Sequence, residues 1–393
     1  MKQILSACLI LAAIWACSKG DLVRSGVRIA STGDIIGAAK QLGTEKAVRY
    51  AANPKALQRD ILKYQKDIER LFETLRKAVG GEWGKEETRE PQPKVYVKYT
   101  QNYLSRASVD FDNGLITVET LDRQAPSKSL KNAIATTLLT PDDPRAVDLY
   151  TAKSIKLGAV PFLFGEVKDH EGQDIRWSWR AERFADHLIQ NKLQVRTIQN
   201  GNISKTVHYV TIAMIQDHLQ VRAQKYRSLV ERFANEFSIS KNLVYAIMKT
   251  ESDFNPYAIS PAPAFGLMQV VPTTAGQDVH KFLNRSGLPS KNFLLEPQNN
   301  IQYGTAYLHL LNYKYLNDIQ NPVSREYCVI AAYNTGAGNV LRTFDPERER
   351  ASRRINSLEP LQVYNTLRET LSHDEARRYL VKVLDNKKEF VNF

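Results

Sequence analysis

The spacing of apolar residues changes twice along this chain, and those changes limit the folds that it can adopt. The first pattern has steps of three and four residues and consists of Leu57, Ile61, Tyr64, Ile68, Leu71, Phe72 and Leu75. Such steps place apolar side chains on one face of a helix, which we expect to end at Gly80-Gly81. From Lys94 the pattern alternates with a period of two, and from Gln216 it becomes helical again.

Alternating apolar and polar residues predict a small antiparallel sheet in the first part of the chain. The predicted strands are residues 95–99, 107–111, 116–121, 193–199 and 207–215. Asp112-Asn113-Gly114 and Asn200-Gly201-Asn202 are typical of hairpin turns. Helices are predicted near residues 130–139 and 177–190.

We therefore expect an α+β fold in two domains, for which 393 residues are sufficient. Residues 55–215 are predicted to form an N-terminal α+β domain with a small antiparallel sheet. Residues 216–393 are predicted to form a mainly α-helical domain. The first domain shows no chemistry in its sequence, and three of its aromatic residues are interpreted as core or helix-face residues rather than sugar platforms: Trp83, Trp177 and Trp179.

The N-terminus has the pattern of a bacterial lipoprotein signal. Residues 1–16 start with a basic stretch and continue in an apolar run that is short for a membrane span. Ala16 is small enough for a signal peptidase, and the thiol of Cys17 would receive the lipid, although Trp15 is bulkier than usual. Residues 17–54 are interpreted as a tether. We expect a lipid anchor in the outer membrane, facing the periplasm; the alternative is an ordinary signal or N-terminal anchor with an incidental cysteine.

The positive charge of the chain favours an anionic partner. A formal net charge of +12 suits nucleic acid, lipid headgroups or an acidic cell-wall polymer. The sequence has no run of five or six like charges and no glycine-rich phosphate loop, so we do not expect nucleic-acid binding. It also has no paired cysteines or histidines with zinc spacing, so we expect no metal site.

Cys328 would be the single cysteine of the mature chain, because Cys8 lies in the signal and Cys17 would be acylated. No intramolecular disulfide could then form. Cys328 lies in an apolar segment, where a free cysteine is usually a small core residue. No local signature of a catalytic thiol accompanies it.

Glu251 is the candidate for acid catalysis. It follows the apolar helical segment of residues 243–250 and precedes a loop that contains Pro256, Pro261 and Pro263. A carboxyl group at such a boundary can be partly desolvated, and burial would raise its pKa so that it stays protonated. The alternative is a solvated glutamate at a helix end.

Several short motifs accompany this carboxyl group. Gly266-Leu267-Met268-Gln269 combines a permissive glycine with a side-chain amide, and Ala332-Tyr333-Asn334 combines an aromatic ring with a second amide. Ser260 precedes the first motif, and Glu375 and Tyr379 follow the second. Because amides and aromatic faces bind sugars, the set predicts a carbohydrate site.

In this order and spacing, the motifs resemble the catalytic domain of lytic murein transglycosylases of the soluble type. The resemblance runs from about residue 225 to 385 and implies a goose-lysozyme-like fold that cleaves peptidoglycan. It implies that Glu251 is the general acid and then the base, that Ser260 positions groups near it, and that Tyr379 closes the cleft beside it. The residues that it implies for substrate binding are Met268, Gln269, Tyr333 and Asn334.

The motifs offer one carboxyl group, whereas ordinary glycosidases use two. Asp253 is only two residues from Glu251 and should point elsewhere. The resemblance implies a lyase in which the muramic acid hydroxymethyl group attacks its own anomeric carbon. The MurNAc-GlcNAc β-1,4 bond would break, a 1,6-anhydromuramic acid end would form, and no cofactor would be needed.

Two other classes of function stay open. A lysozyme-type hydrolase would use water and would recruit Asp253 or Glu296 as its base. A non-catalytic wall-binding lipoprotein would keep the groove without using Glu251 as an acid. The expected partners are peptidoglycan glycan strands and a membrane reached through Cys17; no protein partner is predicted.

Overall fold

The computed structural model describes residues 54–158, 160–285 and 287–393. The predicted signal sequence, Cys17 and the tether up to residue 53 lie outside the described residues. No helix within the described ranges is both long and apolar enough to cross a membrane.

The chain divides into two compact units. The larger unit consists of Asp67–Val270 and Ser290–Phe393, and the described part of the smaller unit consists of residues 54–66 and 271–289 without residue 286. In the smaller unit, α11 (Ala275–Phe282) follows a turn in which the Gly276 amide donates to the Val271 carbonyl over 2.9 Å. The other helices and strands of the described residues belong to the larger unit, except for the first residues of α5.

Helix α5 (Pro54–Trp83) confirms the predicted helix but not its end. The expected end at Gly80-Gly81 is wrong, because the helix continues to Trp83. Trp83 is fully buried, and its indole nitrogen donates to the Tyr103 carbonyl over 2.7 Å, so packing stabilises the last turn. The helix stops before Gly84, where φ is +84° and a side chain would be strained.

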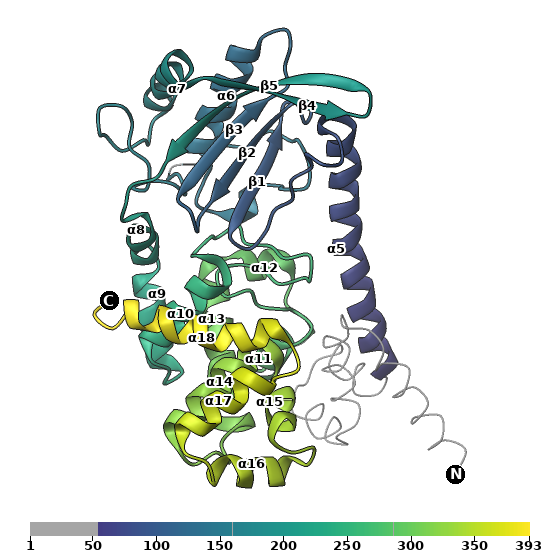
Figure 1. The fold of residues 1–393 in the computed structure, drawn as a ribbon, viewed down its shortest axis with the longest axis vertical. Coiled ribbons are helices and arrows are strands. Elements are labelled where there is room, and N and C mark those ends of the chain that lie inside the picture. The colour runs from purple at the N-terminus through teal and green to yellow at the C-terminus, as the bar shows by residue number, and fades with distance from the viewer. Residues whose placement is uncertain (1–53, 159, 286) are drawn as a thin grey trace. The chain divides into compact units, whose positions relative to one another are not determined.

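Five antiparallel strands form one sheet in the order β1-β2-β3-β5-β4 (Figure 1). The strands are β1 (Val95–Thr100), β2 (Ser105–Asp110), β3 (Leu115–Thr120), β4 (Gln194–Asn200) and β5 (Ile203–Ala213). All five predicted strands are confirmed, although β5 begins earlier than expected. Both predicted turns contain a glycine with positive φ, +63° at Gly114 and +61° at Gly201.

Two helices accompany the sheet, α6 (Pro126–Leu138) and α7 (Ser178–Lys192). They pack against each other, and α6 lies behind the sheet in Figure 1. The buried side chains of α7 are Ala181, Phe184, Ala185 and Leu188. Trp177 and Trp179 lie off this stripe and are 57% and 55% exposed. Of the two predicted positions, core or helix face, Trp83 has the core position, whereas Trp177, the N-cap of α7, and Trp179, in its first turn, are exposed.

The rest of the larger unit is mainly helical, as predicted. Its helices are α8 (His218–Gln224), α9 (Arg227–Glu236), α10 (Lys241–Ser252), α12 (Lys291–Leu295), α13 (Pro297–Leu310), α14 (Pro322–Thr335), α15 (Ala337–Phe344), α16 (Arg348–Asn356), α17 (Pro360–Thr370) and α18 (Asp374–Glu389). α10 and α14 both pack against α18, which brings the C-terminal helix to the end of α10. Cys328 is buried in α14 and free, as expected. The α+β fold with a helical second part is confirmed.

Candidate active site

Glu251 lies in the last turn of α10, where an apolar helix meets a loop. Five side chains of this helix fix its position in the core: Leu243, Val244, Ala246, Ile247 and Met248. The carboxyl group is half-buried, and its Oε1 accepts a hydrogen bond from the Tyr379 hydroxyl of α18 over 2.6 Å. The structure therefore brings together two predicted site residues that are far apart in the sequence.

The surroundings of Glu251 favour its protonated form. Burial raises the pKa of Glu251 to about 7. The Tyr379 hydrogen bond and the Lys94 cation oppose this increase, whereas the negative charge of Glu375 adds to it. A carboxyl group with a pKa near neutral can donate a proton and then accept one at the same pH.

Tyr333 is the second tyrosine at this site. Its hydroxyl donates to the Met268 carbonyl over 2.9 Å, and its ring meets that of Tyr307 edge-on at 5.6 Å. Burial raises the pKa of Tyr333 and of Tyr379 well above the usual value, and the negative charge of Glu251 adds to both shifts. Both hydroxyls therefore stay neutral donors.

The loop that contains Met268 and Gln269 is held by backbone contacts. Gly266 has φ of +72°, and a Cβ there would lie 2.4 Å from Asn300 Nδ2, so only glycine fits. The Met268 side chain is fully buried beside Gly304, and the Met268 carbonyl accepts the hydrogen bond from the Tyr333 hydroxyl. The loop is therefore part of the wall behind the acid.

Gln269 uses its amide nitrogen within this loop. Nε2 donates to the carbonyls of Gly266, over 2.9 Å, and Ala258, over 3.2 Å. Its Oε1 is buried and has no hydrogen-bond partner among the described residues. That oxygen is the part of Gln269 still able to accept a hydrogen bond.

Ser260 and Asn334 are the two other residues that the motifs predicted for this site. Ser260 is half-buried, and its amide donates to the Ala264 carbonyl over 3.1 Å, which closes the turn before the Gly266 loop. Asn334 is exposed at the end of α14, one residue after Tyr333. In the part of the chain that the structure describes, neither side chain forms a recorded hydrogen bond with Glu251.

Asn300 of α13 supports this site and was not found from the sequence. Its Oδ1 accepts from the Met268 amide over 2.7 Å, and its Nδ2 donates to the carbonyls of Phe265 and Leu294 over 2.6 and 2.7 Å. The side chain is fully buried. An asparagine near a helix start has many ordinary roles, so no sequence signal marked it.

The two other carboxyl groups considered as bases are paired elsewhere. Asp253 is buried and forms an ion pair with Lys94 at 2.7 Å. Glu296 pairs with Arg145 at 2.9 Å and accepts from Asn299 over 2.9 Å. The expectation that Asp253 points away from the reaction is consistent with this pairing. No cluster of metal ligands occurs within residues 54–158, 160–285 and 287–393.

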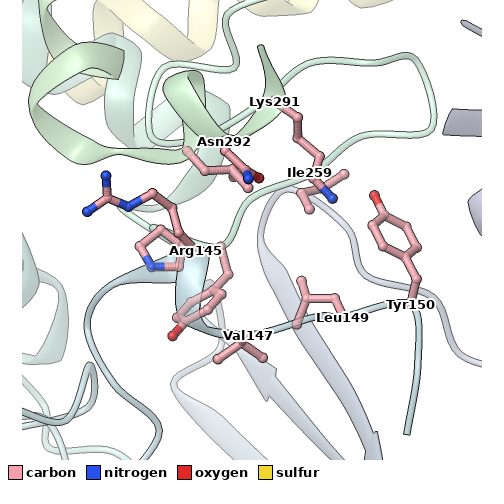
Figure 2. Close-up of a pocket in the computed structure, with 10 residues that line it drawn as sticks. Arg145, Val147, Leu149, Tyr150, Ile259, Lys291 and Asn292 are labelled. Carbon is pink, nitrogen blue, oxygen red and sulfur yellow. The ribbon is translucent and has the colours of Figure 1, made fainter. Parts of the chain in front are cut away.

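A separate small pocket lies away from Glu251 (Figure 2). Its volume is about 30 Å³, enough for one or two water molecules and too small for a sugar ring. Figure 2 shows Arg145, Tyr150 and Lys291 around it. It is therefore not the substrate site.

The comparisons with known proteins agree with this geometry. Residues 228–356 match the transglycosylase SLT domain, which defines the class as a lytic transglycosylase. Residues 57–225 match the N-terminal domain of membrane-bound lytic murein transglycosylase C. The chain belongs to the membrane-bound lytic murein transglycosylase C family. It is thus an enzyme of the lyase class, and the resemblance seen in the motifs is confirmed.

The relatives cover most of the chain. Membrane-bound lytic murein transglycosylase C of Yersinia pestis (strain Pestoides F) is 48% identical over 309 residues, 78% of this chain and 85% of that protein. The protein of the same name from Yersinia pseudotuberculosis serotype O:1b has the same identity and coverage.

Solved structures match a smaller part. The 70 kDa soluble lytic transglycosylase of Escherichia coli is 29% identical over 45% of this chain and 26% of its own, with a TM-score of 0.35. An inactive mutant of lytic transglycosylase Slt from Pseudomonas aeruginosa is 28% identical over 41% of this chain and 23% of its own, with a TM-score of 0.32. The chain thus spans about a quarter of those two proteins.

Proposed function

We propose that this chain cleaves the β-1,4 bond between MurNAc and GlcNAc in peptidoglycan and leaves a 1,6-anhydromuramic acid end, with Glu251 as the single acid and base. The observation that carries the proposal is the half-buried Glu251 carboxyl, which has a pKa raised to about 7 and accepts from Tyr379 over 2.6 Å. The family membership supports murein as the substrate.

The reaction needs two proton transfers, and Glu251 takes part in both. Protonated Glu251 gives its proton to the glycosidic oxygen, and the bond from that oxygen to the muramic anomeric carbon breaks. The C6 hydroxyl of the same sugar then bonds to the anomeric carbon, and the Glu251 carboxylate takes the hydroxyl proton. The acid is regenerated without a cofactor, and intramolecular attack avoids the entropic cost of a second reactant.

The remaining site residues receive proposed roles. Tyr379 holds the Glu251 carboxyl, and Ser260 positions groups near it. Tyr333, Asn334 and Gln269 would line the sugar site, and Met268 would contribute through its backbone. The pairing of Asp253 with Lys94 and of Glu296 with Arg145 favours this mechanism over a lysozyme-type hydrolase, which needs a second free carboxylate.

The domain division and the anchor also belong to this proposal. The boundary between residues 215 and 216 is supported by the end of β5 at Ala213 and the start of α8 at His218. Lipidation of Cys17 and an outer-membrane position facing the periplasm are supported by the sequence pattern and the family's membrane-bound name.

Product analysis tests the proposed function. Purified peptidoglycan is incubated with the protein, and the released fragments are identified by mass spectrometry. Anhydro-muropeptides are expected. Reducing-end products alone would mean hydrolysis, and no release of fragments would mean a binding role.

Tyr379→Phe is expected to lower the rate about tenfold, because the carboxyl loses the group that orients it. The same hydrogen bond lowers the pKa of Glu251, so its loss should move the alkaline limb of kcat/KM to higher pH. Rates on soluble peptidoglycan fragments across pH measure both effects. Tyr364→Phe is the control, since the Tyr364 ring lies 5.5 Å from that of Tyr327 in a tilted arrangement, and this variant should leave the rate and the alkaline limb unchanged.

The rate should fall above about pH 7, because an ionised Glu251 cannot protonate the leaving oxygen. This alkaline limb follows from the raised pKa of Glu251; an ordinary glutamate would already be ionised near pH 5. A pH profile of kcat/KM measures it. A rate that stays constant to pH 9 would contradict the assignment of Glu251 as the acid.

A further inference from the structure

The residues that follow Glu251 have an unusual backbone. Asp253 has φ of +47° and Phe254 has φ of +60°, both in the left-handed region that favours glycine. Asp253 ends α10, and its amide still donates to the Lys249 carbonyl over 3.0 Å. Such a segment keeps its conformation only when other parts of the protein hold it.

The segment before β1 supplies two of the contacts that hold it. Lys94 Nζ lies 2.7 Å from Asp253 Oδ2, and the side-chain amide of Asn255 donates to the Pro93 carbonyl over 2.9 Å. The Asp253 side chain is 2% exposed and that of Lys94 is 34% exposed. Pro93 and Lys94, which precede β1, thus contact Asn255 and Asp253 in the loop that follows Glu251.

A third contact comes from α8. Arg222 Nη1 donates to the Asp253 carbonyl over 2.5 Å. Arg222 is itself fixed, because its Nε donates to Glu166 Oε2 over 2.7 Å and Lys225 donates to the other oxygen of Glu166 over 2.6 Å. Both the side chain and the carbonyl of Asp253 are therefore held.

Lys94 also acts on Glu251 through its charge. The groups that influence the Glu251 carboxyl are Tyr379 and Glu375 of α18 and Lys94 of the segment before β1, and Glu251 in turn influences Tyr333 of α14. The two tyrosines are neutral, and Glu375 is negative. Lys94 is the cation among these groups. It lies 2.7 Å from Asp253 Oδ2 and 3.9 Å from Asp112 Oδ1, and the shorter pairing keeps it near the end of α10.

We propose that Lys94 and Asp253 are a positioning pair through which the sheet-containing domain holds the catalytic carboxyl in place and adjusts its ionisation. The proposal rests on the proposed role of Glu251. Neither residue touches the reacting atoms; both act through the end of α10. The N-terminal domain, which shows no chemistry in its sequence, would thus take part in catalysis.

The test is the pH profile of kcat/KM for Lys94→Met. Losing the cation should raise the pKa of Glu251 and move the alkaline limb up by about half a pH unit, since Lys94 is partly exposed and screened. Lys94→Arg should restore the wild-type limb. Lys168→Met is the control, because the Lys168 side chain is 37% exposed, close to the 34% of Lys94, and pairs with Asp174 at 2.6 Å. The alkaline limb of this variant should not move.

Lys94→Met leaves a buried Asp253 carboxyl unpaired and can fail to fold, so Lys94→Met/Asp253→Asn is measured as well. Asparagine tolerates the left-handed conformation, and the double variant should show the same upward shift of the alkaline limb, because the loss of the Lys94 cation is common to both variants. A limb identical to wild type in the folded variant, or an equal shift in Lys168→Met, overturns the proposal. If wild type forms anhydro products that Glu251→Gln does not, this failure leaves the proposed function intact.

Discussion

Replacing Glu251 by glutamine is expected to lower the rate of peptidoglycan cleavage by about 10²- to 10⁴-fold. Glutamine keeps the size of the side chain and can still accept from Tyr379, but it has no proton to give to the glycosidic oxygen. The rate of anhydro-muropeptide release by the two proteins measures the effect. Equal rates would show that another group is the acid.

Glu375→Gln is the matched control for that substitution. Glu375 is exposed on α18 and influences the Glu251 carboxyl by charge alone. Its neutralisation should lower the pKa of Glu251 slightly and change the rate by less than about threefold. A loss as large as that of Glu251→Gln would indicate that the site depends on its net charge rather than on one proton donor.

Glu251→Gln should also stabilise the protein at high pH. The pKa of Glu251 is raised from 4.5 to about 7 on folding, so its contribution is fully favourable below pH 4.5 and is lost as pH rises through 7. The variant should therefore exceed wild type in unfolding free energy by about 2 kcal/mol at pH 8, after allowance for partial exposure, and match it near pH 4. Urea denaturation at both pH values measures the difference.

Asn300→Ala is expected to destabilise the protein by about 3 kcal/mol or more. The substitution removes the partner that Asn300 supplies to the buried Met268 amide and Leu294 carbonyl, and each such group is costly. The Phe265 carbonyl loses one of its two donors and keeps the Val270 amide over 3.0 Å. The Met268 carbonyl in this loop accepts the hydrogen bond from the Tyr333 hydroxyl, so the cleavage rate should fall together with the stability. The denaturation midpoint and the cleavage rate are measured together.

Asn299→Ala provides the comparison within the same helix. Asn299 is half-buried, and its amide donates to the Phe293 carbonyl over 3.2 Å and to Glu296 over 2.9 Å, where water can replace it. We expect a loss of about 1 kcal/mol and a normal rate. An equal loss in both variants would show that the three contacts of Asn300 do not govern the loop.

Local patterns predicted most of the fold. Alternating residues located all five strands, and the turns at Gly114 and Gly201 follow from the need for positive φ. The end of α5 was wrong because nothing in the sequence shows that Trp83 is buried by other parts of the chain. The choice between a core and a helix-face position for Trp177 and Trp179 stayed open for the same reason, since their exposure depends on which face of α7 is packed.

Some residues of the candidate site were likewise predictable from local sequence patterns, and others were not. Glu251 and Tyr379 belong to motifs with a chemical signature, and the structure joins them at 2.6 Å. Asn300 and Lys94 act through contacts between distant segments, which leave no local pattern. The pKa of Glu251 also depends on burial by the folded chain, so the sequence predicted its direction but not its size.

The most direct test is a titration of the Glu251 carboxyl itself. The protein is labelled with carbon-13 at the glutamate side-chain carboxyls, and their resonances are followed by NMR as pH changes. One resonance should titrate near pH 7 and be missing from Glu251→Gln. If every glutamate titrates at or below about pH 5, Glu251 is an ordinary carboxylate at neutral pH, and it cannot be the proton donor proposed here.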